Sequence, residues 1–343
     1  MKKIDSENER LKLDYQDFLR HAEGLDHKTI DKVLTAIRQF EKSTCCKPFR
    51  RFNKEQAIAF KDWLDSARNS RTAKPLSKAT IASTLRAVRE FFRWLAGQQG
   101  YKKAIGRKDW AYFKQARKDA RAAQVSTPRQ VPSVEQVMRA FEAMPGATST
   151  QKRDKALMAL LMLTGARIGA VASLRLKHVD LERRQVFQDP REVNTKAAKA
   201  MDTTFFPMGG IYVDALADYI THLTLDLMFG PEDALFPKTH IKHGPNGFQA
   251  AGLSRQPFAT TGPLNEIVKD AFAAVQLPRY TPHSFRHMLA LHGDKLCPTR
   301  ETFKAWSQNM GHSSPVITVS SYMPVTADAQ REIILGLGSP LKT

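Results

Sequence analysis

Apolar side chains recur at helical spacing in four segments of the first hundred residues. These segments span residues 11–19, 30–40, 58–64 and 81–95, and each repeats its apolar positions every three or four residues. Pro48 and Pro75 lie in the breaks between them, where helices end. The pattern predicts four or five packed helices in this part of the chain.

The segment 81–95 has two distinct faces. At about 100° per residue, one face gathers the apolar side chains Ile81, Leu85, Val88, Phe92 and Leu95. A second face, roughly 120° away, carries the three arginines Arg86, Arg89 and Arg93. The apolar face predicts core packing, and the arginine face is either a solvated surface or one that binds phosphate groups.

The apolar period disappears between residues 117 and 132, where basic residues and two prolines gather. This composition is typical of an extended linker, which we place at residues 121–131. Ser133 then has the sequence context of a helix N-cap. A second domain is therefore predicted to begin near residue 132.

The second domain opens with a buried helix. Residues 154–163 are apolar nearly all round, as in a helix covered on every side. Gly165 can take the left-handed conformation of a C-terminal cap, so Arg167 is expected at a rigid corner before a short helix that ends at Leu174.

Further segments predict a mixed domain. Residues 185–187, 192–195 and 203–206 resemble short strands of a small antiparallel sheet. Helices are expected at 213–228, 264–275, 282–292 and 299–310, with a loop over 230–263 that contains His240 and His243 at the surface. The fold class predicted is mainly α with a small antiparallel β-sheet.

The charge of the chain points to a polyanionic partner. The 343 residues carry a net charge of +19, and residues 1–130 alone hold 30 lysines and arginines against 15 aspartates and glutamates. Such a surface attracts nucleic acid through phosphate neutralisation, although a basic and merely soluble surface is the alternative.

The composition also excludes several classes of protein. No run approaches the roughly 18 apolar residues of a membrane span, and the N-terminus lacks the apolar stretch of a secretory signal. The three cysteines, two of them adjacent, fit a reduced compartment. We therefore expect a cytoplasmic protein with no membrane partner.

Five residues could carry chemistry, in a fixed order along the chain. Arg167 lies in a TGARIG turn, His283 and Arg286 lie three apart near the start of a predicted helix, and His312 follows Gly311. Tyr322 comes ten residues after His312. Each element alone is a weak signal, because a single arginine or histidine usually has a structural or surface role.

Taken together, the ordered pattern resembles the tyrosine recombinases, the phage-integrase-like site-specific recombinases. The resemblance covers nearly the whole chain. It implies an N-terminal helical, SAM-like core-DNA-binding domain at 1–120, a linker at 121–131 and an α+β catalytic domain at 132–343. It also implies cutting and rejoining of double-stranded DNA at specific recombination sites through a 3′-phosphotyrosine, by a homotetramer on two DNA sites.

The resemblance assigns a role to each motif residue. Arg167, Arg286 and His312 would bind the non-bridging oxygens of the scissile phosphate, Tyr322 would be the nucleophile, and His283 would accept its proton. A lysine on a β-hairpin would protonate the leaving 5′-oxygen. Lys196 and Lys199 both qualify, and we favour Lys196 because it ends a predicted strand.

No cofactor is implied. The sequence contains no Walker-type loop or HExxH motif, and His283 with His287 lacks a third ligand at zinc-site spacing. Tyr280, a rival nucleophile in principle, is expected to pack ahead of the helix.

One position departs from the family pattern. The family usually has an acidic residue three positions after the first arginine, and this chain has Ala170. The departure leaves a non-catalytic DNA-binding regulator open, and a type IB topoisomerase is a further alternative. The apolar residues Ile333, Ile334, Leu335 and Leu337 lie in a tail that we expect to dock on a neighbouring subunit or to pack in cis.

Overall fold

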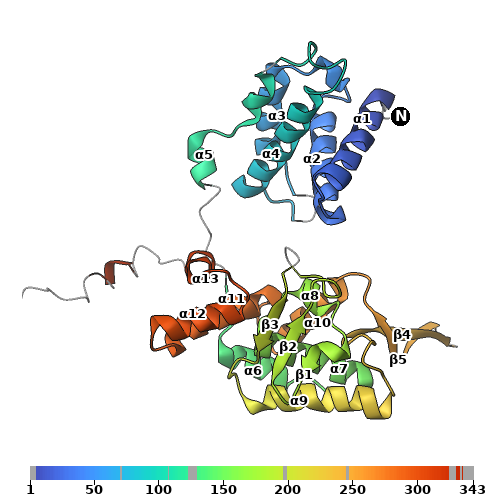
Figure 1. Cartoon of the computed structure of the whole chain (residues 1–343), viewed down its shortest axis with the longest axis vertical. Helices are drawn as coiled ribbons and strands as arrows, with labels where there is room; N and C mark the ends of the chain where they lie inside the picture. The colour runs from blue at the N-terminus through green and yellow to red at the C-terminus, as the bar shows by residue number, and fades with distance from the viewer. Residues whose placement is uncertain are drawn as a thin grey trace, which may run out of the picture. The chain divides into compact units, whose positions relative to one another are not determined.

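The computed structural model describes residues 5–69, 72–106, 108–122, 130–195, 199–244, 247–323, 330–332 and 334. The chain forms two compact units, Met1–Thr127 and Pro128–Thr343 (Figure 1).

The first unit is helical, as the sequence predicts. Its helices are α1 (Ser6–Asp17), extended by a π-helical turn at Phe18–Ala22, then α2 (His27–Ser43), α3 (Lys54–Ser66), α4 (Lys78–Leu95) and the short α5 (Arg117–Ala122). The 3-10 turns Phe49–Arg51 and Asp109–Phe113 lie between them. The side chains of Asp5, Asp26, Asn53 and Ser77 cap the four long helices by accepting a backbone N–H of the first turn.

Aromatic rings fill the core of the first unit. The rings of Phe52 and Phe92 stack with their centroids 3.9 Å apart, and Phe40 meets Phe92 edge-to-face at 5.0 Å. The five apolar positions predicted for α4 are all buried. The apolar face predicted from the sequence of that helix is therefore confirmed.

The second unit is built around α7 (Ser149–Thr164). Every side chain from Ala156 to Thr164 is buried, because other elements of the unit cover α7 on all sides. The remaining helices are α6 (Val134–Glu142), α8 (Ile168–Val171), α9 (Gly210–Thr221, with a π-helical turn at His222–Asp226), α10 (Gly262–Ala274), α11 (Pro282–Leu296), α12 (Arg300–Asn309) and α13 (Pro315–Tyr322). Ser133 caps α6 in a capping box with Gln136, which confirms the predicted N-cap.

A small antiparallel sheet packs beside these helices. Its strands β1 (Val179–Asp180), β2 (Gln185–Gln188) and β3 (Met201–Thr204) lie in that order, with Val186 opposite both Val179 and Thr203. A 3-10 turn at Leu176–His178 leads into β1.

The predicted strand at 192–195 is wrong. The backbone N–H groups of Glu192 and Val193 bond to the carbonyl of Asp189, and the N–H of Asn194 bonds to the Ser173 hydroxyl. A strand needs those donors for a neighbouring strand, so the segment forms a turn. The predicted strand at 203–206 also ends earlier, at Thr204, since the N–H of Phe206 bonds to the Leu163 carbonyl instead.

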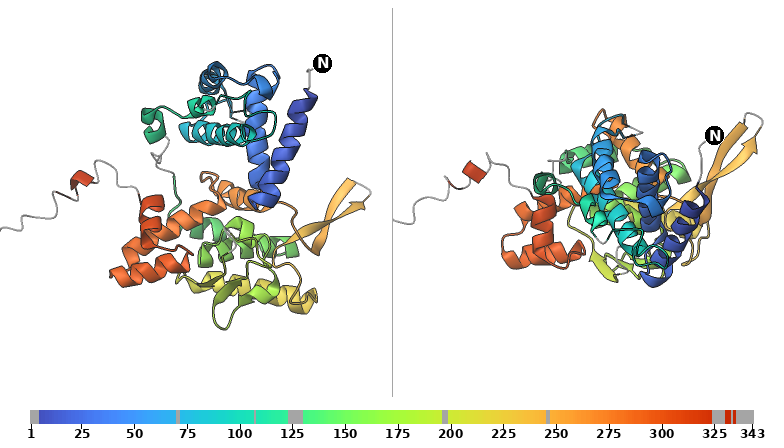
Figure 2. Two further views of the ribbon diagram at one scale, coloured as in Figure 1. Left: turned by 45° about the horizontal axis from the view of Figure 1, so that its top comes forward. Right: turned by 90° about the horizontal axis from the view of Figure 1, so that it is seen from above.

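The predicted loop at 230–263 is also wrong. It contains two long antiparallel strands, β4 (Pro237–Gly244) and β5 (Gly247–Pro257), with register shifts between Pro237 and Ile241. Figure 2 shows this two-stranded ribbon extending away from the rest of its own unit. His240 and His243 are exposed as expected, but on a strand.

Candidate active site

Arg286 lies at the centre of the candidate site. It stands on the first turns of α11, where Thr281 and Ser284 form a capping box, and only 1% of its surface is exposed. Its Nε donates to Tyr322 Oη over 3.1 Å and its Nη1 donates to the carbonyl oxygen of Gly165 over 2.9 Å. A buried guanidinium is stable only when such acceptors surround it, so Arg286 ties α7 and α13 to α11.

The third nitrogen of Arg286 reaches the segment after α12. Its Nη2 donates to the Met310 carbonyl and, over 2.9 Å, to His312 Nε2. An arginine cannot accept a hydrogen bond, so Nε2 must be the unprotonated nitrogen of His312. The other nitrogen, Nδ1, then donates to Thr318 Oγ1 over 2.7 Å, and Thr318 is linked in turn to Ser307.

Electrostatics agree with this neutral imidazole. Burial lowers the pKa of His312 to about 4, with further contributions from the cations of Arg286, Arg167 and Lys199. Burial, and then the like charge of Arg167, also lower the pKa of Arg286. Three cations therefore lie close enough to influence one imidazole.

Tyr322 reaches the cluster of its own chain and packs among three histidine rings. It ends α13, which Ser314 caps and Pro315 begins, and 8% of its surface is exposed. Its ring centroid is 4.5 Å from that of His287, 5.4 Å from that of His312 and 6.1 Å from that of His283. The phenol oxygen thus lies beside a guanidinium, with imidazoles on its flanks.

Two glycines make these close approaches possible. Gly165 ends α7 in the left-handed conformation, with φ of +57°, as the sequence predicts. Gly311 has φ of +76°, and a Cβ there would lie 2.1 Å from the Sδ of Met201. The residue before His312 therefore needs glycine for its conformation and for its space.

Arg167 borders a small cavity beside this cluster. It is the N-terminal flanking residue of α8, and a cavity of about 30 Å³ is lined by Arg167, Ala170, Gln188, Thr195, Lys199, Met201 and Gly311. The hydroxyl of Thr195 is buried and has no hydrogen-bond partner among the residues that the structure describes. The lining contains two cations and no carboxylate within those same residues, so it suits a small anionic or polar group.

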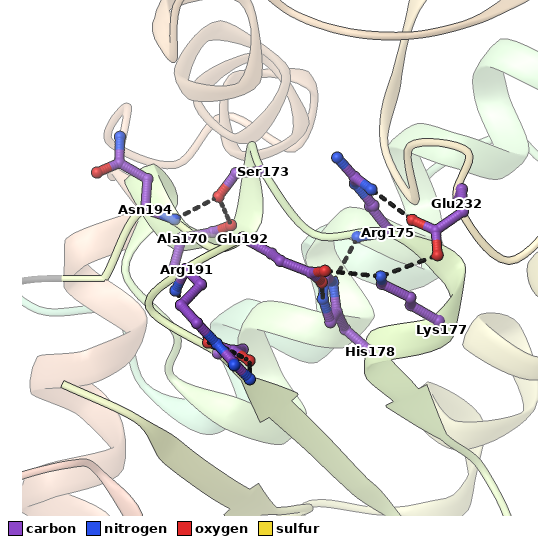
Figure 3. A network of polar contacts seen from close by, with 10 residues as sticks. Ala170, Ser173, Arg175, Lys177, His178, Arg191, Glu192, Asn194 and Glu232 are labelled. Atoms are coloured by element: carbon purple, nitrogen blue, oxygen red, sulfur yellow. Dashed lines mark hydrogen bonds and ion pairs between the residues drawn. The ribbon is translucent and has the colours of Figure 1, made fainter. Parts of the chain in front are cut away.

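A polar network supports the backbone on the Ala170 side of this cavity (Figure 3). The Ser173 hydroxyl donates to the Ala170 carbonyl over 2.9 Å and accepts from the N–H of Asn194 over 2.8 Å. Glu192 accepts from Lys177 over 2.9 Å and bonds to the buried His178 over 2.9 Å. These bonds hold the segment that leads to Thr195 against α8, although no carboxylate stands at position 170.

The network continues to the turn before β4. Lys177 also donates to Glu232 over 2.9 Å, and Arg175 forms an ion pair with the same carboxylate. The pKa of Glu232 is lowered by its bonds to Lys177 and Arg175. Glu192 and Glu232 therefore both pair with basic side chains, and neither of them lines the cavity.

The structure brings most of the predicted site residues together. Arg286, His312 and Tyr322 are in direct contact, His283 flanks the tyrosine as an exposed residue, and Arg167 and Lys199 share the cavity. Lys196 lies outside the described residues. Tyr280 is buried against Phe272, with ring centroids 5.0 Å apart, so it packs as expected.

The arginine face of α4 is partly neutralised. Arg86 and Arg93 are exposed, whereas Arg89 is half-buried. Glu90, which sequence analysis missed, accepts from Arg89 over 2.8 Å and pairs with Arg93 at 2.8 Å. Arg86, Glu90 and Arg93 line a cavity of about 800 Å³ between α2 and α4.

Sequence analysis overlooked three further site residues. His287 follows Arg286 directly and lies four residues after His283, so helical spacing could have placed it beside the tyrosine. Thr318 and Thr195 had no signal in the sequence, because their roles depend on tertiary contacts.

Two features are absent from the described part of the chain. It holds no group of three or more His, Cys, Asp or Glu side chains arranged to bind a metal ion. None of its helices combines the length and hydrophobicity needed to cross a lipid bilayer.

The chain is similar to several known proteins. The profile of the Phage integrase family matches residues 130–328. The tyrosine recombinase XerD of Corynebacterium glutamicum is 30% identical over 224 residues, which cover 63% of this chain and 65% of that protein. The tyrosine recombinase XerC of Roseiflexus castenholzii is 26% identical over 241 residues, 69% of this chain and 66% of that protein. The chain thus spans about two thirds of the length of these relatives.

Solved structures show the same fold at low identity. A lambda integrase tetramer bound to a Holliday junction aligns with a TM-score of 0.62 and 14% identity, covering 91% of this chain and 79% of that one. The Tn1549 transposon integrase in complex with transposon right end DNA aligns with a TM-score of 0.58 and 19% identity, covering 96% and 99%.

Proposed function

This chain belongs to the phage integrase family, and we propose that it is a site-specific tyrosine recombinase that cuts and rejoins duplex DNA through a 3′-phosphotyrosine, without metal or ATP. One observation carries the proposal. The cations of Arg286, Arg167 and Lys199 all lie close enough to His312 to lower its pKa, in addition to the effect of burial. Beside them, the Tyr322 Oη lies 3.1 Å from Nε of the Arg286 guanidinium.

The cationic groups suit the transition state of phosphoryl transfer. Attack on a phosphodiester gathers negative charge on the non-bridging oxygens, and fixed donors stabilise that charge more than the ground state. Arg286 and Arg167 would bind those oxygens. The hydroxyl of Thr195, which has no hydrogen-bond partner among the described residues and lies on the same cavity as Arg167, would supply a further neutral donor.

His312 would change its protonation when the phosphate binds. In the structure its Nε2 accepts from Arg286, so it offers no donor there. Burial is the main cause of its lowered pKa, and the cations of Arg286, Arg167 and Lys199 lower it further; a bound phosphate would offset the effect of these cations. We propose that His312 then gains a proton and donates to the phosphate.

Tyr322 would be the nucleophile. Its oxygen would form a bond to phosphorus as the bond to the 5′-oxygen breaks, and its proton would pass to a histidine. His283 remains our proposal for that base. The buried His287, whose ring is closer to Tyr322, is the alternative, and rate–pH profiles of His283→Gln and His287→Gln would separate the two.

We propose Lys199, in place of the Lys196 favoured by the sequence, as the acid that protonates the leaving 5′-oxygen. Lys199 lines the cavity with Arg167, and its charge contributes to the lowered pKa of His312. A substrate with sulfur at the bridging 5′ position tests this, because a thiolate leaves without a proton. That substrate is expected to restore cleavage by Lys199→Ala. Restoration of Lys196→Ala instead would return the role to Lys196.

The first unit would bind the duplex through its basic surface. Arg86 and Arg93 are exposed along α4, and Lys32 and Thr29 of α2 line the same cavity. Exposed cations with hydroxyl groups are typical of phosphate contacts. Arg89 is expected to contribute less than Arg93, because both pair with Glu90 but Arg89 is half-buried whereas Arg93 is exposed.

Assembly is proposed from the relatives. The lambda integrase structure above is a tetramer on a Holliday junction, and we propose that this chain likewise acts as a homotetramer through exchange of its C-terminal tail. Of the tail residues predicted to dock, only Ile334 is described, and it is exposed.

A plasmid assay tests the function. DNA trapped on the protein in cells would be sequenced to obtain the target site, which is then placed twice on a supercoiled plasmid. The proposal predicts recombinant products with the wild-type protein and none with Tyr322→Phe. Relaxation of a plasmid that lacks the site would favour a topoisomerase, and site binding without any strand cleavage would favour a regulator.

A further inference from the structure

The ribbon formed by β4 and β5 has a composition unlike the rest of the chain. Residues 237–257 contain Lys238, Lys242 and Arg255 and no aspartate or glutamate. Elsewhere in the second unit basic side chains are commonly paired with carboxylates, as in the network around Glu192 and Glu232. The ribbon therefore carries a net positive charge, and its two lysines lie on β4.

Two arginines, Arg153 and Arg255, fix the base of this ribbon. Arg153 of α7 donates to the Pro237 carbonyl and to Thr239 Oγ1, each over 3.0 Å. Arg255 pairs with Asp233 and donates to the Met228 carbonyl over 2.9 Å. These contacts fix the base of the ribbon to the rest of the second unit.

Beyond its base the ribbon's described side chains are exposed, and none of them is packed in the core of the unit. The side chains of Ile241 and Lys242 are exposed, with 59% of the surface of Ile241 accessible, and Gln249 and Ala250 opposite them on β5 are exposed as well. A two-stranded hairpin is only marginally stable by itself in water. Such an element is expected to gain stability from a partner.

The cations of β4 point to the chemistry of that partner. Among the described residues neither Lys238 nor Lys242 forms an ion pair, and Lys238 donates only to the side-chain oxygen of Gln256, over 3.0 Å. A basic ribbon without carboxylates complements a polyanion. A two-stranded ribbon also fits the major groove of B-form DNA, and edges rich in lysine discourage pairing with another strand.

We propose that the β4–β5 ribbon is a DNA-binding arm that adds phosphate contacts to those of the catalytic cluster and the first unit. The eight residues of β4 span about 26 Å at roughly 3.3 Å per residue, or about eight base pairs of duplex. An arm of this length can therefore contact several consecutive phosphates. This inference rests on the proposed DNA-binding function.

The salt dependence of DNA binding tests the proposal without knowledge of the target site. Binding of the full chain to a labelled random-sequence duplex is measured over a series of salt concentrations. Each phosphate contact contributes about 0.9 to the slope of log K against log salt. Lys238→Gln with Lys242→Gln is expected to lower the slope by up to about 1.8, and Lys242→Gln alone by about 0.9.

A matched control is available on α7. Lys152 lines a cavity with Asp214, Asp218 and Asp226, so Lys152→Gln removes the same single charge from a surface rich in carboxylates. Its slope is expected to equal that of the wild type. An equal loss in Lys152→Gln and Lys242→Gln would overturn the proposal, because the effect would then follow net charge and not the ribbon.

Crosslinking gives an independent readout that does not depend on removing a charge. A photoreactive phenylalanine analogue in place of Ile241 is expected to crosslink to the duplex. Crosslinks to a second protein chain, or self-association of the lysine variants with an unchanged salt slope, would overturn the proposal in favour of strand pairing between copies. A wild-type protein that binds no duplex would refute the proposed function itself, whereas normal binding with unchanged slopes would refute only the arm.

Discussion

Substitution of Gly311 is expected to damage both the stability of the second unit and the site. Gly311 has φ of +76°, a conformation that costs an alanine about 1–2 kcal/mol. The added Cβ would lie 2.1 Å from Met201 Sδ and 3.3 Å from its Cε. The overlap involves only the flexible end of the Met201 side chain, which can move to a less favourable rotamer at about 0.5–1.5 kcal/mol, so Gly311→Ala should lower the free energy of unfolding by about 1.5–3.5 kcal/mol.

The two contributions can be separated by a double-mutant cycle with Met201→Ala. Removing the Met201 side chain takes away the overlap but leaves the backbone strain. The effect of Gly311→Ala should therefore be smaller by about 0.5–1.5 kcal/mol in the Met201→Ala background.

Urea unfolding followed at one tryptophan measures the cycle. Of the four tryptophans only Trp306 belongs to the second unit, so the ¹⁹F signal of 5-fluorotryptophan there reports that unit alone. The rate of covalent DNA adduct formation should fall with Gly311→Ala and recover in part in the double variant, because Gly311 precedes His312. An equal destabilisation by Gly311→Ala in both backgrounds would refute the steric reasoning.

Three further outcomes follow from the structure. Burial lowers the pKa of His312 to about 4 from an ordinary value near 6.5, so between these pH values the unfolded chain binds a proton that the folded chain does not. The free energy of unfolding should therefore fall by about 1–2 kcal/mol as the pH drops from 6.5 to 4. In urea titrations, His312→Gln should flatten this dependence on pH. Asn8 is buried and its side chain bonds to Glu41, to the Lys47 carbonyl and to the N–H of Phe49, so Asn8→Ala should destabilise the first unit by about 2–4 kcal/mol, and a change below 0.5 kcal/mol would show that these bonds contribute little. Truncation after Met323 should leave DNA binding by single chains intact but reduce the four-subunit complex in analytical ultracentrifugation, and an unchanged tetramer would contradict tail exchange.

The parts of the fold that sequence predicted are those set by local patterns. The helix α7 was predicted because its residues are apolar nearly all round, and Gly165 because a helix C-cap needs a left-handed residue. The ribbon was missed since both of its faces are exposed, which removes the alternation of apolar and polar residues that marks a half-buried strand. The strand expected at 192–195 failed because the carbonyl of Asp189 and the hydroxyl of Ser173 take its donors.

The candidate site was predictable to a similar extent. The order of Arg167, His283, Arg286, His312 and Tyr322 was sufficient to name the cluster. Which lysine joins it depends on the path of the chain after the turn at residues 189–195, and no local pattern encodes that path. The same holds for the buried hydroxyl of Thr195, which only tertiary packing places on the cavity.

The identity of the residue that becomes linked to DNA tests the central claim most directly. Protein–DNA adducts isolated from cells under denaturing conditions would be digested with nuclease and protease and examined by mass spectrometry. The account predicts a single nucleotide-bearing peptide, modified at Tyr322 and absent from Tyr322→Phe. Adducts on another residue, or adducts that persist in Tyr322→Phe, would contradict it.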